Sequence, residues 1–345
     1  FFFMKNTFKI VFVIIGTLIG AGFASGQEMY VFFFSYGIRG LYGIIVSSTL
    51  MGIIIYKSLN IINKYNINNY KDFINNIIKF DFKRKYFNIK NIFNIIINLF
   101  ILITFFIMIA GFGAYFNQVF KLNIFFGSAI LAFLCFFIFL GSIKRFIKIN
   151  QILIPILITL IFFVGILNLN KIDFTELFNL IPKINSGNWL LSSILYCSYN
   201  SILLIPVLIT LNNYIKNKKQ ILIISIISTI FIIALSIILF SVLINVNVDI
   251  STLEMPIVYV VSKMFKGLNI LYGFVIISSI FTTSISLGIS FLQNFIKNRK
   301  SYTHIAAIMC ITSIIISQFG FSNLVNLLYP IFGYLGFIQI VTLLI

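Results

Sequence analysis

The sequence predicts an all-α membrane protein that crosses the bilayer about ten times. Of its 345 residues, 60% are hydrophobic and 9% are charged, and the mean hydropathy is +1.10. A soluble domain carries about 25% charged residues. The apolar residues form long runs between short polar or basic turns, and a run of about 20 apolar residues spans a bilayer as a helix. The composition therefore excludes a soluble globular protein.

The apolar runs define one transmembrane domain over residues 1–345. We place the spans near residues 8–36, 40–59, 91–117, 122–141, 147–168, 189–212, 219–245, 256–280 running on to 295, 302–319 and 322–345. Lys263 and Lys266 interrupt the start of the eighth run. We therefore expect a short re-entrant or surface helix near 253–265 and the span proper from about Leu268 to Lys297.

The basic residues set the orientation, because cytoplasmic loops carry an excess of Lys and Arg. With the N-terminus inside, the inner segments hold 19 of the 25 basic residues, eight of them in and beside a basic loop at 60–90. Both termini are then expected on the cytoplasmic side of a cell membrane. The net charge of +18 thus reports topology, with anionic lipid on the cytoplasmic side as the expected partner and no nucleic acid.

The three cysteines, Cys135, Cys197 and Cys310, lie far apart in apolar runs. Their spacing predicts neither a disulfide framework nor a metal site, and we expect small buried side chains. The first apolar run is too long and too interrupted for a signal peptide. Met4 is the expected natural start. The last apolar run reaches the end of the sequence, so the sequence leaves open whether a C-terminal tail follows.

The first span contains a polar and glycine-rich interruption, Gly16–Glu28 (GTLIGAGFASGQE). Backbone in lipid must satisfy its own hydrogen bonds, so a helix interrupted at mid-depth survives only where it lines a protein-enclosed cavity. Helices broken in this way form the substrate sites of many secondary transporters. Close helix packing on small residues is the other explanation of these glycines.

A second interruption lies in the sixth span, where the polar stretch 195–201 is followed by Pro206. Proline removes a backbone donor and disfavours helix at the residue before it. The two interruptions lie five spans apart, in the first and sixth spans. Because five is an odd number, a second five-span unit would cross the membrane in the opposite direction to the first. We therefore expect two inverted repeats, 8–168 and 189–345, with broken helices 1 and 6. Interhelical hydrogen bonds are the alternative role for the polar residues of 195–201.

A third polar cluster, 278–286, lies in the eighth span and is rich in Ser and Thr. Helical hydroxyls can bond to their own backbone carbonyls, which is one reading of this cluster. The other is a cation site, because hydroxyl oxygens together with carbonyls from an unwound helix would replace the hydration shell of a hard cation such as Na⁺.

With these three elements the chain resembles the amino acid–polyamine–organocation superfamily, and within it the YkvI-type amino-acid permeases of Gram-positive bacteria. The resemblance covers essentially the whole chain and rests most on the run Gly16–Glu28. The supporting pieces are Tyr199–Ser201, Glu254–Pro256, Phe281–Thr283 and Tyr329–Gly336. It implies a LeuT-type fold of two inverted five-helix repeats and secondary active transport.

The resemblance also implies a substrate site. Free amides at Ala21 and Gly22 would receive the carboxylate of the substrate. Carbonyls near Thr17 and Leu18, together with the stretch 196–198, would receive its ammonium group. The dipole of the helix that restarts there agrees with the first assignment. The substrate-binding residues expected on this basis are Thr17, Leu18, Gly20, Ala21, Gly22, Phe23, Tyr196, Ser198, Tyr199 and Asn200. Aromatic and small neighbours suggest a neutral amino acid of modest size.

In sodium-coupled relatives a cation lies between first-helix carbonyls and a hydroxyl pair on the eighth helix. That pattern maps onto the Gly16 and Ile19 carbonyls with the Thr282 and Thr283 side chains. Phe23 stands where one relative has an Asn of a second sodium site, so we expect that second site to be absent. Span five shows no Lys of the kind found in some proton-coupled relatives, which favours Na⁺ over H⁺ as the coupling ion; no other cofactor is expected.

Glu28 lies six residues beyond Gly22, about 9 Å further along a straight helix. An ionisable residue at that depth suggests a functional role. Three readings are open: titration during transport, closure of an outer gate with a partner such as Arg39, or simple reach to the interface.

Other classes fit less well. His304 is the only His, and neither a His-Glu-x-x-His nor a Gly-x-Ser-x-Gly arrangement occurs, so we expect no enzyme. No span shows a filter-like repeat of the kind a channel would need. The serious alternative is a ligand-sensing receptor that keeps the transporter fold, as in spore-germinant receptor subunits, for which partner subunits would be required.

Overall fold

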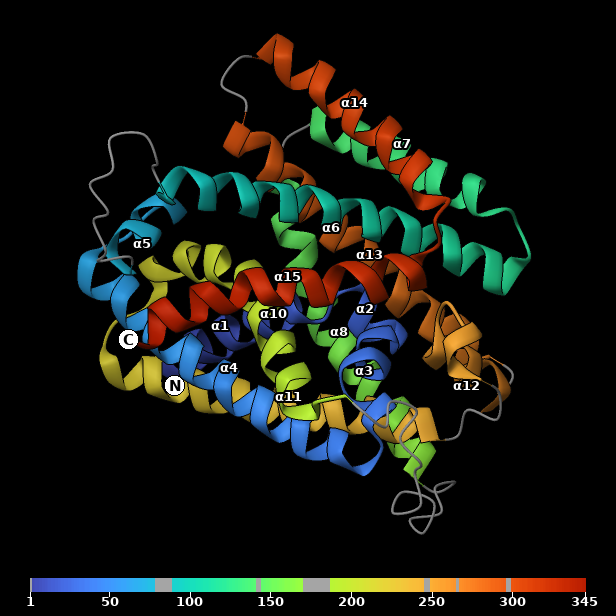
Figure 1. The fold of residues 1–345 in the computed structure, drawn as a ribbon, viewed down its shortest axis with the longest axis horizontal. Coiled ribbons are helices and arrows are strands. Elements are labelled where there is room, and N and C mark those ends of the chain that lie inside the picture. Colours follow the sequence, from blue (N-terminus) through green and yellow to red (C-terminus); the bar gives the residue numbers. More distant parts are fainter. Residues whose placement is uncertain are drawn as a thin grey trace.

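The protein is a bundle of helices in the computed structural model, which describes residues 2–77, 89–140, 144–169, 187–244, 249–264, 267–295 and 299–345. The helices of the first half are α1 (Phe2–Leu18), α2 (Ala21–Ser25), α3 (Gln27–Phe32), η1 (Phe34–Tyr36), α4 (Ile38–Tyr65), α5 (Tyr70–Ile77), α6 (Ile89–Phe120), α7 (Ile124–Leu140) and α8 (Lys144–Leu169). Those of the second half are α10 (Trp189–Thr210), η2 (Asn212–Tyr214), α11 (Lys218–Ile244), η3 (Ile250–Thr252), α12 (Pro256–Met264), α13 (Leu268–Phe295), α14 (Arg299–Ser317) and α15 (Phe321–Leu344). Figure 1 shows the long helices crossing the molecule side by side, with α1, α10 and α2 inside the bundle.

Each of the ten expected spans corresponds to a long helix or, for the first span, to a chain of short ones. Six helices are long and apolar enough to cross a membrane, and four shorter apolar helices accompany them among the described residues. The expectation for the eighth run is confirmed, because α12 is a short separate helix and α13 is the span proper. The basic loop predicted at 60–90 begins with α5 and continues outside the described residues after Ile77.

The first span is broken, as predicted. Helix α1 ends at Leu18 and α2 starts at Ala21, with Gly20 in an extended conformation between them. A second interruption at Gly26 separates α2 from α3. The element therefore consists of three helical pieces inside one membrane depth.

The predicted break in the sixth span is wrong, because α10 runs without interruption from Trp189 to Thr210 with Pro206 inside it. The polar side chains that suggested a break bond to carbonyls of their own helix. The Ser198 hydroxyl donates to the Ile194 carbonyl at 2.7 Å, and the Asn200 amide donates to the Tyr196 carbonyl at 3.0 Å. Such bonds satisfy polar side chains within a helix and leave its backbone intact.

The two ends of the bundle are defined by contacts between distant segments. At one end, the termini end, Lys57 donates to the Leu344 carbonyl, Gln220 donates to Thr7, and Asn212 donates to Asn66. Figure 1 shows the N-terminus, the C-terminus and α5 gathered at this end, with α12 at the opposite end. We call that opposite end the α12 end.

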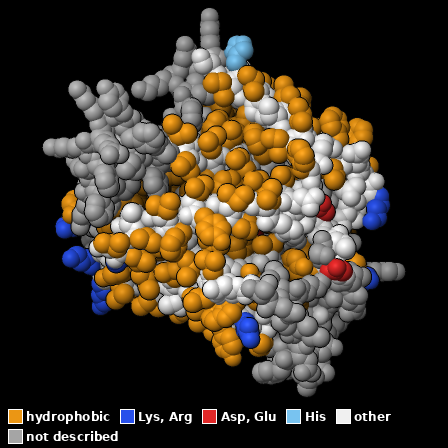
Figure 2. Space-filling view, in the orientation of Figure 1, with side chains coloured by type: hydrophobic (Ala, Val, Ile, Leu, Met, Phe, Trp, Pro, Cys, Tyr) orange, Lys and Arg blue, Asp and Glu red, His pale blue; other side chains and the backbone are white. Residues whose placement is uncertain are grey.

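The surface around the bundle is largely apolar. Ile270 and Phe133 are 74% and 63% exposed, although both belong to long hydrophobic helices. Figure 2 shows hydrophobic side chains over most of the described surface in view, with Lys and Arg at its margins. A continuous apolar exterior of this kind fits contact with lipid. The free cysteines Cys135, Cys197 and Cys310 are all buried, as expected.

Candidate functional site

The break between α1 and α2 brings open backbone into the middle of the bundle. The Ile19 N–H still bonds back to the Ile15 carbonyl at 2.9 Å, and the Gly20 N–H donates to Leu18 at 3.0 Å, which tightens the last turn of α1. Gly20 then turns to extended backbone, so the first amides of α2 have no helical partner. A Cβ added at Gly20 would meet nothing within 4 Å, so the chain here borders open space.

A sharp turn at Gly26 folds the chain back on itself. Gly26 has φ of +84°, and its N–H donates to the Phe23 carbonyl at 3.1 Å, which ends α2. A side chain is strained in this left-handed conformation, so glycine is required. The straight-helix estimate, which placed Glu28 about 9 Å beyond Gly22, is therefore wrong: the Glu28 carboxyl group lies against Gly22, where an added Cβ would overlap it.

Glu28 is buried at the centre of the site and is only 3% exposed. Its carboxylate accepts hydrogen bonds from the Tyr199 hydroxyl of α10 and from the Phe23 N–H of α2. The reading in which this side chain reaches the membrane interface is therefore wrong. Arg39, the suggested gate partner, is exposed at the start of α4.

Aromatic rings from three elements pack together around Tyr199, whose hydroxyl bonds to this carboxylate. The Tyr199 ring lies between Phe32 of α3 and Tyr329 of α15, at centroid distances of 5.5 and 4.8 Å and interplanar angles of 22° and 30°. Tyr196 meets Tyr199 edge to face at 5.6 Å. We call the group Phe32, Tyr196, Tyr199 and Tyr329 the aromatic cluster. It ties α3, α10 and α15 together around the broken helix.

The hydroxyl-rich part of α13 packs against the other side of the break. The Ser279 hydroxyl donates to the Ile19 carbonyl at 2.9 Å, and the Tyr272 hydroxyl donates to the Ala24 carbonyl at 2.6 Å. Thr282 bonds instead to the Ser279 carbonyl within α13, at 3.1 Å. The hydroxyl that reaches the first-helix carbonyls in this structure is thus that of Ser279, with Thr282 one turn further along the helix.

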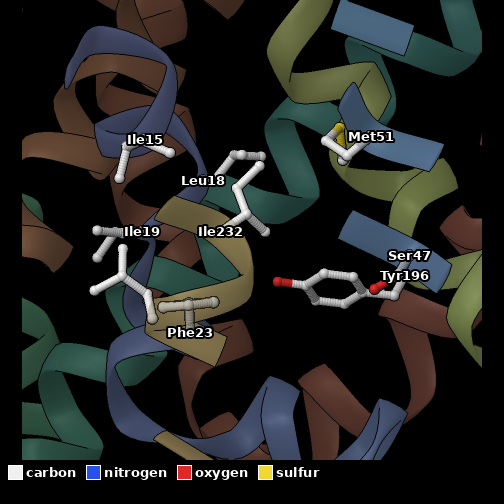
Figure 3. Close-up of a pocket in the computed structure, with 9 residues that line it drawn as sticks. Ile15, Leu18, Ile19, Phe23, Ser47, Met51, Tyr196 and Ile232 are labelled. Atoms are coloured by element: carbon white, nitrogen blue, oxygen red, sulfur yellow. The ribbon is translucent and has the colours of Figure 1, made fainter. Parts of the chain in front are cut away.

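A small cavity of about 10 Å³, room for roughly one water molecule, lies beside the break. It is lined by Ile15, Leu18, Ile19, Phe23, Ser47, Met51, Tyr196, Ile232 and Leu235. Figure 3 shows the Tyr196 hydroxyl pointing toward the space between Phe23, Leu18 and Ile232. The lining is apolar apart from Ser47 and Tyr196, so the cavity suits an apolar group. Three of the expected substrate residues, Leu18, Phe23 and Tyr196, line it.

The structure does not bring all the expected residues to one place. Ser198 and Asn200 bond within α10, and the Thr17 hydroxyl bonds to the Val13 carbonyl at 2.8 Å within α1. The sequence analysis did not include Phe32 or Tyr329 in the site. No local feature of the sequence distinguishes Phe32. Tyr329 belongs to the stretch Tyr329–Gly336 that supports the resemblance, which assigns it no role in binding.

A polar network links four elements at the α12 end. The backbone N–H of Met255 donates to the Gln118 side chain, whose amide donates back to the Met255 carbonyl, both at 3.0 Å. The Glu254 carboxylate accepts from the Ser322 N–H at 2.6 Å, and Gln27 of α3 donates to the Ser322 hydroxyl at 2.8 Å. Burial raises the pKa of the Glu254 carboxyl, although the N–H groups of Ser322 and Phe321 oppose this shift. The segment before α12 is thus fixed to α6, α15 and α3.

Two comparisons place the chain among known proteins, whereas a scan of family models gives no match. A manganese transporter of Eremococcus coleocola, solved with an aromatic bis-isothiourea compound, matches with a TM-score of 0.61 at 15% identity, over 99% of this chain and 78% of that one. A Na⁺-coupled sialic acid symporter in a substrate-bound outward-open state matches with a TM-score of 0.54 at 14% identity, over 96% and 75%. The chain is therefore an all-helical polytopic membrane protein with the LeuT-type transporter fold.

At the level of sequence, two proteins of Bacillus subtilis (strain 168) are similar to the chain. The uncharacterized membrane protein YkvI is 29% identical over 334 residues, which is 95% of this chain and 92% of YkvI. The uncharacterized protein YyaD is 26% identical over 340 residues, 98% of this chain and 96% of YyaD. The chain is a distant homologue of YkvI over nearly its full length, as the sequence resemblance predicted. Among the described residues, no group of three or more His, Cys, Asp or Glu could hold a metal ion.

Proposed function

We propose that the protein is a secondary active transporter that carries a small organic solute across a bacterial cell membrane by alternating access. The observation that carries this proposal is the break at Ile19 and Gly20, which places non-helical backbone inside a buried bundle. Irregular backbone at membrane depth is tolerated where it lines a cavity or a substrate path. The transporter fold and the polar network at the α12 end support the same conclusion.

The substrate class that we propose is a neutral amino acid. The broken helix offers polar backbone to a charged head group, and the adjoining cavity offers Leu18, Phe23 and Met51 to an apolar side chain. The proposed site comprises Thr17, Leu18, Gly20, Ala21, Gly22, Phe23, Tyr196, Ser198, Tyr199 and Asn200. Glu28 completes it as a coupling or gating residue.

The proposed coupling ion is Na⁺, bound between α1 and α13 by the Gly16 and Ile19 carbonyls and the Thr282 and Thr283 hydroxyls. All of these ligands are oxygens, which suit a hard cation. The contact between Ser279 and the Ile19 carbonyl supports the placement, because it shows that hydroxyls of α13 reach the end of α1. In the ion-bound form we expect the Ser279 hydroxyl oxygen and the Ile19 carbonyl oxygen to turn toward the ion.

The molecule divides, in this proposal, into two inverted repeats at 8–168 and 189–345. The termini end, which carries Lys57, Lys64 and Lys218, would face the cytoplasm, in keeping with the excess of basic residues on inner loops. The α12 end would face outward, and its polar network would then hold the outer gate closed.

The test is uptake by proteoliposomes of each of the twenty labelled amino acids, with and without an inward Na⁺ gradient. Accumulation driven by the gradient is the expected result. Uptake that is equal at zero and saturating Na⁺ would contradict sodium coupling but leave transport standing. Thermal stabilisation by an amino acid without any uptake would instead favour the receptor-like alternative, which a pull-down of partner subunits in mild detergent would then have to support.

A further inference from the structure

The carboxylate of Glu28 is surrounded by neutral groups. Gly22 and Phe23 face it from α2, Tyr196 and Tyr199 from α10, and Tyr329 from α15. The carboxylate accepts hydrogen bonds from two neutral donors, the Tyr199 hydroxyl and the Phe23 N–H. Within the described part of the chain, no Lys or Arg side chain contacts it. The site therefore holds one acidic group and no basic partner for it.

A buried carboxylate that is ionised needs a positive partner. Removing an ionised group from water is costly unless a charge of opposite sign accompanies it. Buried acidic residues in membrane proteins accordingly pair with a cation or mark the path of one. Since the described residues supply no such group here, the partner would come from the substrate.

The surroundings of Glu28 favour one type of cation. In the aromatic cluster, Phe32 and Tyr329 pack against the ring of Tyr199, whose hydroxyl bonds to Glu28, and aromatic rings beside a carboxylate recognise organic ammonium groups. We propose that Glu28 binds the ammonium group of the substrate, so that the amino group is obligatory and the carboxylate dispensable. This inference rests on the proposed function and redefines its substrate class by the amino group, as amphipathic primary amines that include amino acids.

The position of Glu28 also argues against a second carboxylate at this point. The Glu28 side chain already occupies the space beside Gly22 and accepts the Phe23 N–H. A substrate carboxylate at the same amides would repel it, because like charges at close range in a low dielectric are strongly unfavourable. An amine without a carboxylate avoids this conflict.

Phe23 connects the carboxylate to the apolar cavity. Its N–H donates to Glu28, while its side chain lines the cavity with Ile15, Met51 and Ile232. A ligand with its ammonium at Glu28 would thus direct a short aliphatic chain toward these residues. Isoamylamine, which is leucine without its carboxylate, has this form.

The experiment compares three probes, leucine, isoamylamine and 4-methylpentanoate, by thermal stabilisation of the purified full chain. We expect isoamylamine to bind within about tenfold of leucine or more tightly, and 4-methylpentanoate to bind about 10- to 100-fold more weakly than isoamylamine, the range for losing a charged hydrogen bond. Glu28→Gln should weaken isoamylamine binding by a similar factor. The matched control is Asp72→Asn, which removes a charge from an exposed position of helix α5 and should leave binding unchanged.

The inference is overturned if isoamylamine does not stabilise the wild-type protein, or if 4-methylpentanoate binds as well as isoamylamine. The wild-type comparison needs no variant, so it decides the question even if Glu28→Gln does not fold. Sodium-driven uptake of amino acids without recognition of isoamylamine would overturn the inference alone. Failure of all twenty amino acids in the uptake assay would instead count against the proposed function, while isoamylamine binding would still decide the role of Glu28.

Discussion

Two glycines of the broken helix, Gly20 and Gly22, differ in the space around them. A Cβ at Gly22 would overlap the Glu28 carboxyl group, whereas a Cβ at Gly20 would meet nothing within 4 Å. We therefore expect Gly22→Ala to displace Glu28 from Phe23 and to lower substrate uptake by about tenfold or more, at a cost of about 1–3 kcal/mol of stability for the overpacked side chain. Uptake by proteoliposomes and thermal unfolding measure the two effects.

The matched control for this prediction is Gly20→Ala. Its backbone is extended, with φ of −86°, so alanine fits without strain, and the loss of glycine at a helix N-cap costs no more than about 1 kcal/mol. Equal loss of uptake in both variants would mean that flexibility of the break matters, and not the room that Gly22 leaves for Glu28.

The hydroxyl of Ser279 is the side chain of α13 that reaches the end of α1, at 2.9 Å from the Ile19 carbonyl oxygen. If the proposed Na⁺ site lies here, Ser279→Ala removes an oxygen from its edge, and we expect the Na⁺ concentration for half-maximal uptake to rise by about tenfold, or 1.4 kcal/mol. Ser284→Ala is the control, because that hydroxyl bonds to Ile280 within α13. An unchanged Na⁺ dependence in the Ser279 variant would place the ion elsewhere.

At the scale of elements, the two interrupted spans show what sequence patterns can and cannot predict. The break in the first span was predictable because glycines and polar residues together remove both helix propensity and apolar character from an otherwise hydrophobic run. In α10 the same reasoning failed, because Ser198 and Asn200 find acceptors in their own helix. Whether a polar side chain bonds locally or across helices depends on its rotamer and neighbours, which residue type alone does not determine.

The N-terminus of α15 depends on a residue from a distant segment. Gly320 provides no side-chain cap, and the Glu254 carboxylate instead accepts the N–H groups of Ser322 and Phe321. We expect Glu254→Ala to lower the free energy of unfolding by about 1–3 kcal/mol, because it leaves these amides unsatisfied. Glu254→Gln keeps an acceptor oxygen and should cost less. Thermal unfolding of both variants in the same detergent tests this; equal stability of all three proteins would contradict the capping role.

The same carboxyl group predicts a dependence of stability on pH. Burial raises the pKa of Glu254 in the folded protein, so the folded state keeps this proton to higher pH than the unfolded state does. The resulting stabilisation is fully present below the pKa of the unfolded chain and is lost as pH rises through the raised value. The melting temperature of the wild type relative to Glu254→Gln should therefore increase from pH 8 to pH 5. A difference that is constant over this range would contradict the assignment.

At the scale of the whole molecule, the site depends on contacts that no single segment reveals. Glu28, Tyr199 and Tyr329 are separated by more than 100 residues from one another, and the turn at Gly26 redirects Glu28 toward α2. The ten spans and the first break follow from local composition, so they were predictable. The aromatic cluster arises only when α3, α10 and α15 pack together, so the sequence did not indicate Phe32 or assign a role to Tyr329.

The proposed orientation in the membrane gives a prediction for the whole molecule. Contacts at the termini end join Asn212 to Asn66 and Gln220 to Thr7, so Asn213 lies at that end, and Ser262 of α12 lies at the other. Both residues are exposed, whereas the three native cysteines are buried. In intact cells, a membrane-impermeant maleimide should label Ser262→Cys but not Asn213→Cys, and permeabilised cells should label both. The native chain serves as the background control. Labelling of Asn213→Cys alone from outside would reverse the orientation, and with it the assignment of the α12 end as the outer gate.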